Sequence, residues 1–256
     1  MTATAVRRLA GQVAIVTGAS RGIGRSIALG LAEHGADVAL AARKPEGLEE
    51  AAGAIAKLGR KPLVVPTNVR RIEELQALVD RTQAELGRVD FLVNNAATNP
   101  TFGAIQDLDE RAFDMLMNSN VKSVHFLSNF ARAAMLKHGQ GGAIVNVSSI
   151  GGFKASDVIG GYSVTKAAVI MLTQVQAKSW GRDGIRVNCI APGLIRTEFA
   201  RALWENESMV KGTIAESALK RIGEPDEMAG AAVYLCSPAA SFVTGQTLVL
   251  DGGRLL

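Results

Sequence analysis

The sequence predicts a single α/β domain built on a doubly wound parallel sheet of about seven strands, with helices on both faces. Three observations lead to this prediction. Short β-branched apolar runs alternate with stretches in which apolar residues recur at helical spacing. A glycine-rich turn directly follows the first run, and no repeat, low-complexity tract or linker divides the 256 residues. Because parallel strands need helical crossovers, this alternation indicates one domain over residues 1–256.

The first half of the chain contains four expected strands separated by three expected helices. The strands are short apolar runs at residues 12–16, 37–42, 61–66 and 89–93. The helices between them carry apolar residues at helical spacing, namely Ile23, Ile27 and Leu31, then Leu48, Ala52, Ile55 and Leu58, then Ile72, Leu75, Val79 and Leu86.

The second half continues the alternation. It predicts a long helix over 111–138, a strand at 143–147, a helix containing residues 162–166, a strand at 185–190, and a final edge strand within 242–253. The segment 198–216 has a mixed apolar pattern that fits either a packed amphipathic helix or a mobile lid. We adopt the lid interpretation, in which its apolar side closes over a substrate and excludes water.

Composition argues against several functional classes. The net charge is only +4, Lys and Arg are spread along the chain, and aromatic residues make up 5%, so no nucleic-acid partner is expected. No apolar run approaches the ~20 residues of a membrane helix, and residues 1–10 lack the apolar core of a signal peptide, so we expect a cytoplasmic protein. Cys189 and Cys236 lie in apolar stretches and the three histidines lack ligand spacing, so no metal site is expected.

Residues 17–24 suggest a phosphate-binding turn. They join an apolar strand to a helix, and Gly18, Gly22 and Gly24 have the spacing G-x-x-x-G-x-G rather than the dinucleotide fingerprint G-x-G-x-x-G. Glycines let the backbone approach a ligand, and the amino terminus of a helix offers unpaired N–H groups to a phosphate. Taken alone, the turn fits an ordinary strand-to-helix connection equally well.

The end of the second strand predicts the nucleotide preference. Arg43 lies roughly 20 residues after the glycine turn, where a dinucleotide-binding fold places the group that meets the adenosine ribose, and no acidic residue stands there. Arg43, together with Arg21, can pair with a 2′-phosphate. We therefore expect NADP(H) rather than NAD(H); the alternative is that both arginines are merely solvated.

Tyr162 and Lys166 are the candidate catalytic pair. Positions i and i+4 share one face of a helix, so the phenol and the ammonium can act on one substrate. Ser149 ends the predicted fifth strand at the carboxyl edge, where open parallel sheets bind ligands. Asn120 interrupts an apolar helical pattern, and a buried polar residue of this kind needs a partner or a role.

Six motifs, taken in order, resemble the short-chain dehydrogenase/reductase family over essentially the whole chain. They are the T-G-x-x-x-G-x-G turn, N-N-A at residues 94–96, Asn120, Ser149, Y-x-x-x-K at residues 162–166, and Pro192-Gly193 with Thr197. This resemblance implies a Rossmann fold and NAD(P)-linked chemistry on alcohols and carbonyls. The stretches 95–100 and 185–204 look particularly similar to NADPH-dependent carbonyl reductases of aromatic ketones and retinal.

The resemblance also implies the role of each site residue. Tyr162 would be the general acid in reduction, its pKa lowered by Lys166 and by an oxidised nicotinamide; Ser149 would donate to the substrate oxygen, and Asn120 would hold a water that links Lys166 to solvent. The implied cofactor-binding residues are Gly18, Ser20, Arg21, Gly22, Ile23, Gly24, Arg43, Asn68, Val69, Asn95, Ala96, Tyr162, Lys166, Pro192, Gly193, Ile195 and Thr197. The implied substrate-binding residues are Ser149, Phe153, Tyr162, Phe199 and Trp204.

Two positions depart from the family pattern without removing a catalytic group. Ala97 stands where Gly usually follows N-N-A, and Asn68 stands where an Asp usually meets the adenine. The expected function is NADPH-dependent reduction of a mid-sized apolar ketone or aldehyde to an alcohol. The alternatives are a 3-oxoacyl-thioester reductase acting with an acyl-carrier protein, an NAD-linked alcohol dehydrogenase, and a non-catalytic nucleotide-binding protein. The resemblance also implies a homotetramer, or a homodimer, that buries the last strand between copies.

Overall fold

Seven parallel strands form one sheet in the order β3-β2-β1-β4-β5-β6-β7. The computed structural model describes residues 9–256, so most of the segment on which the absence of a signal peptide was argued lies outside the described residues. The strands are β1 Val13–Thr17, β2 Asp37–Ala42, β3 Pro62–Pro66, β4 Phe91–Asn94, β5 Gly142–Val147, β6 Ile185–Pro192 and β7 Thr247–Leu250. The seven expected strands are confirmed, with ends shifted by a few residues.

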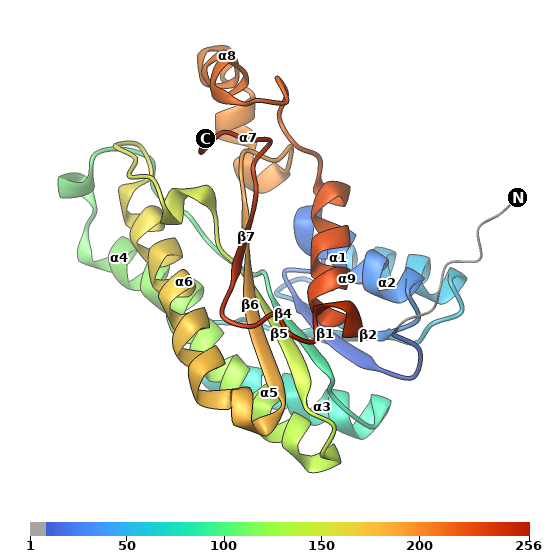
Figure 1. Cartoon of the computed structure of the whole chain (residues 1–256). Helices are drawn as coiled ribbons and strands as arrows, with labels where there is room; N and C mark the ends of the chain where they lie inside the picture. Colours follow the sequence, from blue (N-terminus) through green and yellow to red (C-terminus); the bar gives the residue numbers. More distant parts are fainter. Residues whose placement is uncertain (1–8) are drawn as a thin grey trace, which may run out of the picture.

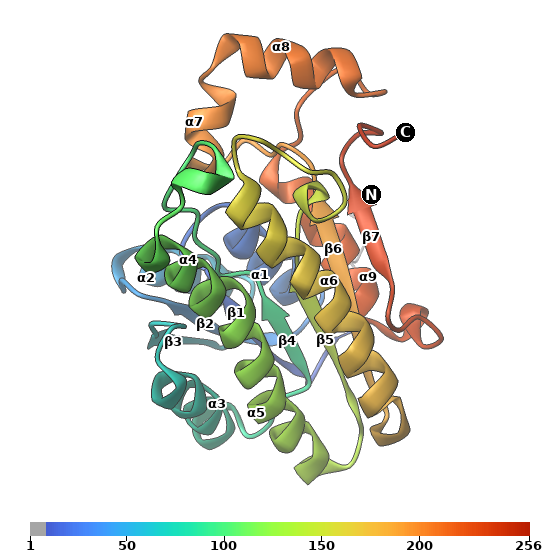
Figure 2. The same ribbon diagram turned by 90° about the vertical axis from the view of Figure 1, so that its left-hand side faces the viewer.

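The strand order reverses at β1, and this reversal positions the site. The chain winds outward from β1 to β3, crosses back to pair β4 with β1, and then winds outward to β7 (Figure 2). At the carboxyl ends, Thr17 of β1 pairs with Ala41 of β2 on one side, while Val16 pairs with Val93 of β4 on the other. Connections leave the two neighbouring strands in opposite directions there, which opens a crevice at the carboxyl edge of the sheet.

Helices cover both faces of the sheet, as expected (Figure 1). On one face lie α1 Gly22–Glu33, α2 Glu46–Lys57 and α9 Ala229–Cys236, which share a core with the sheet through Ile27, Leu48 and Leu235. On the other lie α3 Ile72–Leu86, α5 Ser123–His138 and α6 Gly160–Trp180, which contribute Leu75, Leu127 and Trp180 to a second core.

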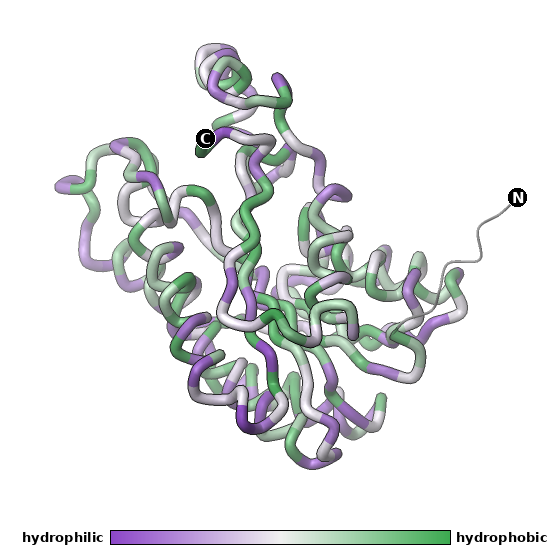
Figure 3. Tube along the Cα trace, viewed as in Figure 1, coloured by the Kyte–Doolittle hydropathy of each residue, from purple (hydrophilic) through white to green (hydrophobic). Residues whose placement is uncertain are grey.

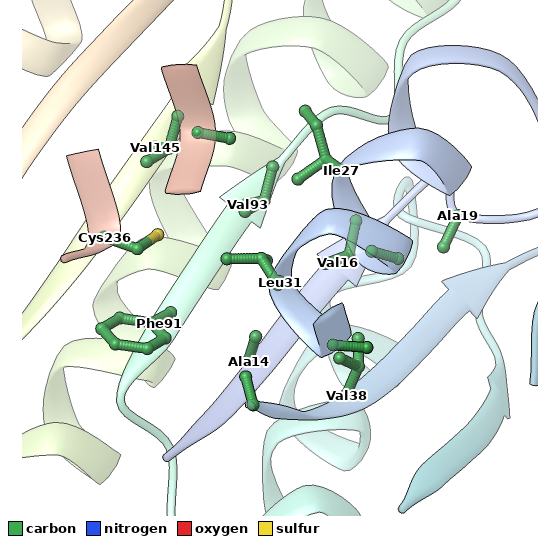
Figure 4. Packing of buried hydrophobic residues seen from close by; sticks show 14 of the residues in the cluster. Ala14, Val16, Ala19, Ile27, Leu31, Val38, Phe91, Val93, Val145 and Cys236 are labelled. Carbon is green, nitrogen blue, oxygen red and sulfur yellow. The ribbon is translucent and has the colours of Figure 1, made fainter. Parts of the chain in front are cut away.

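The strands themselves are the most apolar part of the molecule. All five residues of β1 are buried, and Leu31 of α1 packs with Val16 and Val93 of the neighbouring strands (Figure 4). Each fully buried Leu, Ile or Val side chain contributes roughly 1.5–3 kcal/mol relative to its exposed state. Hydrophilic residues lie mainly in the outer helices and loops rather than in the central strands (Figure 3). Cys189 in β6 and Cys236 at the end of α9 are buried free thiols.

The expected continuous helix over 111–138 is wrong in one respect. The chain forms α4 Glu110–Met117, then a π-helical turn Asn118–Lys122, and then α5. The Asp109 side chain begins α4 by accepting a hydrogen bond from the Ala112 N–H at 2.7 Å. Asn120 lies inside the π-helical turn, so the residue that interrupts the apolar pattern also interrupts the regular helix.

Two short helices and the carboxyl-terminal tail lie beyond the carboxyl ends of the strands. They are α7 Arg201–Trp204 and α8 Glu207–Glu216, and the end of the chain lies near them in both views (Figures 1 and 2). Within residues 9–256, no helix is both long and apolar enough to cross a bilayer. Nor does that part of the chain bring three His, Cys, Asp or Glu side chains together in a group that could hold a metal ion.

Candidate active site

A cavity of about 730 Å³ opens at the carboxyl edge of the sheet. Its wall is built by the glycine turn, by the residues that follow β2, β3, β4, β5 and β6, by the start of α6, by the segment 197–216 and by Arg254 and Leu255. A cavity of this size falls in the range that holds a cofactor or a substrate, roughly 300–1,000 Å³. The strand reversal and the cavity therefore coincide.

The glycine turn is held by its own backbone and by Asn95. Gly18 and Gly22 adopt φ values of 67° and 54°, and a Cβ on Gly24 would stand 2.3 Å from the Gly18 carbonyl oxygen. Asn95 Nδ2 donates to the Thr17 carbonyl at 2.9 Å, and Thr17 Oγ1 accepts from the Asn95 and Ala96 N–H groups at 3.0 Å each. These bonds fix the end of β1 against the end of β4.

The amino terminus of α1 is open toward the cavity. Arg21 occupies the N-cap position without a side-chain cap, and Gly22 and Ile23 line the cavity. The first N–H groups of a helix lack partners within the helix, so this end offers donors and partial positive charge to a phosphate. The turn therefore has the chemistry that a nucleotide pyrophosphate requires.

The side chains beyond the turn also fit a nucleotide. Arg21 and Arg43 are exposed, line the cavity, and take part in no ion pair among residues 9–256. Asn68 and Val69 also line the cavity. The Asn68 N–H donates a hydrogen bond to Glu74 Oε2 at 2.6 Å, which holds this part of the loop in place. The acidic residues lining the described cavity, Asp157, Glu198 and Glu216, come from the loop after β5 and from residues 198–216.

Tyr162 and Lys166 lie in the first turns of α6, on the cavity wall. Lys166 Nζ donates to the Val147 carbonyl at 2.8 Å and lies 5.3 Å from the centre of the Tyr162 ring. Lys166 is only 3% exposed, and this burial lowers its pKa to about 8. At neutral pH the side chain is therefore still mostly an ammonium, held between a carbonyl and the aromatic ring.

The protein packed around Tyr162 raises the pKa of its phenol above the usual value, and a hydrogen bond with the Ser149 side chain lowers it by less. This differs from the sequence-based expectation of a lowered pKa. The reason is that desolvation of a phenolate outweighs the hydrogen bond that would stabilise it. The expectation also included a lowering of the Tyr162 pKa by an oxidised nicotinamide, and that effect applies only when the nucleotide is bound. Without nucleotide, the Tyr162 hydroxyl stays protonated through the neutral range.

Ser149 follows β5 and begins a short 3₁₀ turn, Ile150–Gly152. The Gly151 N–H donates to Ser149 Oγ at 3.1 Å, so this oxygen accepts from the backbone and keeps its own hydrogen for another acceptor. The neighbouring Ser148 donates through Oγ to the Lys166 carbonyl at 2.7 Å and ties the end of β5 to α6. Sequence reasoning did not single out this Ser148 bond, because no spacing pattern indicates that its partner is the Lys166 carbonyl, 18 residues further along the chain.

Asn120 is fully buried and its side chain is used by the fold. Its Oδ1 accepts from the Thr98 N–H at 2.8 Å, and its Nδ2 donates to the Thr98 carbonyl at 2.9 Å and to Thr165 Oγ1 at 3.0 Å. Both amide hydrogens are thus used, and the residue lies outside the cavity lining. Its contacts join the π-helical turn to the loop after β4 and to α6, rather than offering an amide hydrogen to a water.

Known proteins similar to this chain identify its family. A family model described as enoyl-(acyl carrier protein) reductase matches residues 18–254. Dehydrogenase/reductase SDR family member 4 of Oryctolagus cuniculus is 39% identical over 245 residues, covering 96% of this chain and 94% of the relative. The chain belongs to the short-chain dehydrogenase/reductase family.

Solved structures with bound nucleotides share the fold closely. A 7α-hydroxysteroid dehydrogenase complexed with NADH and 7-oxo glycochenodeoxycholic acid has a TM-score of 0.93 and 34% identity, covering 99% of this chain and 98% of its own. A gluconate 5-dehydrogenase from Burkholderia cenocepacia, in complex with NADP and tartrate, has the same TM-score, identity and coverage. As a member of this family the protein is an oxidoreductase with an NAD(P)(H) site, and the two complexes differ in which nucleotide they hold.

Most of the residues that the short-chain dehydrogenase/reductase resemblance assigned to the cofactor line the cavity. They are Gly18, Ser20, Arg21, Gly22, Ile23, Arg43, Asn68, Val69, Asn95, Ala96, Tyr162, Lys166, Pro192, Gly193, Ile195 and Thr197. Gly24 does not line it and instead permits the close approach inside the turn. Gly193 is also sterically required, because a Cβ there would stand 2.8 Å from the Asp251 Cα.

The substrate-binding residues expected from family resemblance divide into two groups. Ser149, Tyr162 and Phe199 line the cavity, with the Tyr162 and Phe199 rings 6.0 Å apart. Phe153 and Trp204 lie outside its lining, so the structure does not place them at a substrate. Trp204 instead donates through Nε1 to the Thr197 carbonyl at 2.6 Å and lies 5.4 Å from the Arg196 guanidinium.

Other cavity residues were missed by sequence reasoning. Lys154 lies in the loop after β5, and Arg254 and Leu255 lie in the tail after β7. No motif or spacing marks these positions, because each reaches the cavity only through the folding of an irregular segment. The apolar part of the wall includes Leu203 and Met209 from the 198–216 segment.

Proposed function

We propose that the protein is an NADPH-dependent oxidoreductase that reversibly reduces a ketone or aldehyde to an alcohol. The observation that carries this proposal is the convergence of Tyr162, Ser149 and Lys166 on the wall of the cavity that begins at the glycine turn. A proton donor, a second hydroxyl and a buried ammonium beside a nucleotide site are the groups that carbonyl reduction requires.

Each of the three side chains has its own role in the proposed reaction. Bound NADPH supplies the hydride. Tyr162, kept protonated by its surroundings, donates the proton to the carbonyl oxygen. Ser149, whose oxygen already accepts from the Gly151 N–H, directs its hydrogen to the same oxygen and stabilises developing negative charge. Lys166 favours the phenolate that remains, through its positive charge beside the ring.

The preference for NADPH rests on Arg43 and Arg21. Both are exposed at the cavity, and a 2′-phosphate gives them a charge-assisted partner that NADH lacks. We expect Arg43→Ala to raise the KM for NADPH about tenfold or more, with little change for NADH. Lys44→Ala is the matched control, because Lys44 is an exposed neighbouring cation that does not line the cavity. If the ratio of the KM values for NADPH and NADH were the same in Arg43→Ala as in the wild type, the proposal would be contradicted.

The apolar wall supports a mid-sized apolar carbonyl substrate under the 198–216 lid. The test is initial-rate oxidation of NADPH and NADH against an aromatic ketone, an α-diketone, retinal and a 3-oxoacyl thioester. We expect the aromatic ketone and the diketone to be reduced fastest with NADPH.

The same panel tests the other candidates. The description of the matching family model names an acyl-carrier-protein substrate, so preference for the thioester would favour a 3-oxoacyl-thioester reductase. Faster turnover with NADH would favour an NAD-linked alcohol dehydrogenase, consistent with the NADH bound by the hydroxysteroid dehydrogenase. NADPH binding without turnover of any compound would favour a nucleotide-binding protein.

Two sets of exposed apolar side chains support self-association as a homotetramer. Val164, Met171 and Val175 lie on one exposed face of α6, and Leu248 and Val249 are exposed on the edge strand β7. Each set can pack against its own copy about a twofold axis, and two different twofold interfaces generate a tetramer. A single such interface gives a homodimer.

A further inference from the structure

A cluster of three charged side chains lines the cavity and has no part in the proposed proton transfer. Glu216 Oε2 is shared by two cations, with Arg254 Nε at 2.9 Å and Lys154 Nζ at 3.7 Å. The three residues come from the end of α8, the carboxyl-terminal tail and the loop after β5. All three line the cavity. Segments far apart in the chain thus bring two positive charges to one place.

The tail is folded so that Arg254 becomes part of the wall. Asp251 accepts from the Gly253 N–H through Oδ1 at 2.8 Å and from the Leu255 N–H through Oδ2 at 2.9 Å. Ser217 Oγ donates to the Gly252 carbonyl at 2.9 Å and ties the tail to the end of α8. The Arg254 side chain is 27% exposed, compared with 62% for Lys154, so it is partly enclosed rather than freely solvated.

The cations retain unused donors. Among residues 9–256, Arg254 forms a hydrogen bond only through Nε, so both of its terminal nitrogens are available, and Lys154 Nζ forms none. Arg254 and Lys154 together lower the pKa of Glu216, so this carboxylate is ionised at neutral pH and holds Nε in place. A guanidinium with free terminal nitrogens beside an ammonium is suited to bind a further carboxylate.

The rest of this part of the wall is less favourable to an anion. Glu198 lines it but pairs with Arg201 at 3.1 Å, and Asp157, three residues after Lys154 in the same loop, is exposed. The adjacent surface is apolar and includes Leu203, Met209 and Leu255. In this part of the wall, an anionic group has a favourable position at the Lys154 and Arg254 side chains, with apolar surface next to it.

We propose that Lys154 and Arg254 form an anion subsite, and that the preferred substrates are carbonyl compounds carrying a carboxylate separated from the carbonyl by an apolar spacer. This proposal rests on the proposed carbonyl reduction at Tyr162 and adds a second point of recognition. Glu216 acts as a positioning residue that orients Arg254. The carbonyl is held at Tyr162 and Ser149, the spacer lies against the apolar wall, and the carboxylate pairs with the two cations.

The test compares one ketone with and without its charge. Benzoylbutyrate and its methyl ester contain the same aromatic ketone, and only the acid has a carboxylate. We expect the wild-type KM for the acid to be about tenfold lower than that for the ester at low ionic strength, with the difference shrinking as salt is added. Arg254→Gln and Lys154→Gln should raise the KM for the acid toward the ester value, leaving kcat and the ester KM unchanged.

Two further variants separate binding from folding. Arg254→Lys keeps a cation at the tail and should retain part of the preference for the acid. Arg81→Gln makes the same charge change at an exposed pair with Glu85 on α3, outside the cavity lining, and should change neither KM. Lys154 is an exposed loop residue, so Lys154→Gln tests the subsite without disturbing the tail.

Equal wild-type KM values for the acid and the ester would overturn the subsite. So would an equal rise for both compounds in Arg254→Gln, because that result assigns Arg254 to tail packing alone. If neither ketone is reduced, the proposed reaction fails separately, and calorimetric titration of both compounds into protein loaded with NADP⁺ gives the same comparison. Tighter binding of the acid would then support the subsite, and equal affinity would overturn it.

Discussion

The Tyr162 hydroxyl is the group on which the proposed reaction depends most. Tyr162→Phe removes this proton donor and keeps the ring that packs near Phe199. We expect kcat for ketone reduction to fall by roughly 10²–10⁴-fold with little change in NADPH affinity, as for loss of a general acid. The other tyrosine of the chain, Tyr234, lies on α9 outside the cavity lining, so Tyr234→Phe serves as the control. A Tyr162→Phe enzyme with normal turnover would exclude this residue as the proton donor.

Lys166 also links catalysis to stability. Burial lowers its pKa to about 8, from 10.5 in the unfolded chain, so between these values the unfolded state binds more protons. The contribution of Lys166 to the free energy of unfolding therefore rises with pH between about 8 and 10.5, and it is progressively lost as the pH falls toward 8. We expect the stability of the wild type, relative to Lys166→Met, to increase by about 1 kcal/mol between pH 7.5 and 9.

Urea denaturation of the two proteins across that range measures this difference. The subtraction removes the effect of Cys189, whose pKa is raised to about 11 by burial and which is present in both proteins. Parallel stability curves for wild type and variant would mean that the ammonium is not desolvated.

Side chains at the ends of regular elements were the ones that the sequence could place. Ser149 follows a strand, and Tyr162 and Lys166 share a helical face, so the parallel sheet brings them together once their elements are assigned. Phe153 and Trp204, which the structure leaves outside the cavity lining, lie in or next to irregular segments, where side-chain direction depends on local contacts. For Trp204 the decisive contact is the Thr197 carbonyl, which no spacing rule reveals.

Gly24 in α1 and Gly53 in α2 are both helical, but they differ in the space available for a side chain. A Cβ on Gly24 would stand 2.3 Å from the Gly18 carbonyl oxygen and 2.4 Å from Asn95 Nδ2, whereas a Cβ on Gly53 in α2 would meet nothing within 4 Å. We expect Gly24→Ala to destabilise the protein by about 1–3 kcal/mol or more and to weaken NADPH binding. Gly53→Ala should stabilise it by roughly 0.5–1 kcal/mol, because alanine favours a helix interior.

Thermal unfolding and NADPH titration of both variants provide the measurement. Similar melting temperatures for the two substitutions would show that the turn relaxes easily, contrary to the close packing described above.

The π-helical turn Asn118–Lys122 shows what periodicity cannot predict. Apolar residues on both sides keep a nearly helical spacing, so the pattern indicates one helix from 111 to 138. A π-helical turn is set by tertiary contacts, here those of the Asn120 side chain with Thr98 and Thr165. The sequence marked Asn120 as unusual, but the partners that explain it are 22 and 45 residues away.

The proposed tetramer of the protein can be tested by a substitution on the exposed face of α6. Met171→Glu places a charge on this face between the exposed Val164 and Val175, and should reduce the mass measured by light scattering. Ala77→Glu puts the same charge on an exposed position of α3 and should leave the mass unchanged. A monomeric wild type at micromolar concentration, or a Met171→Glu protein of unchanged mass, would contradict self-association through this face.

The overall architecture was predictable because it follows from repeated local patterns. Strand and helix alternation sets the sheet, and the order of the units sets its crevice. The part that was not predictable is the closure of the cavity by the tail. Arg254 reaches the wall through the Asp251 turn and the Ser217 bond, which join residues that no periodic pattern relates.

The two buried thiols lie on opposite sides of the sheet. Cys236 is the last residue of α9 and packs in the core on the α1 and α9 face, whereas Cys189 of β6 packs with Val124 of α5 and Val169 of α6. Burial raises their pKa values, to about 12 for Cys236 and about 11 for Cys189, so an alkylating reagent can reach a reactive thiolate only when the covering layer opens. Labelling followed by mass spectrometry therefore reports on each layer separately: equal rates mean that the molecule opens as one unit, and faster modification of Cys236 means that the α9 layer detaches first.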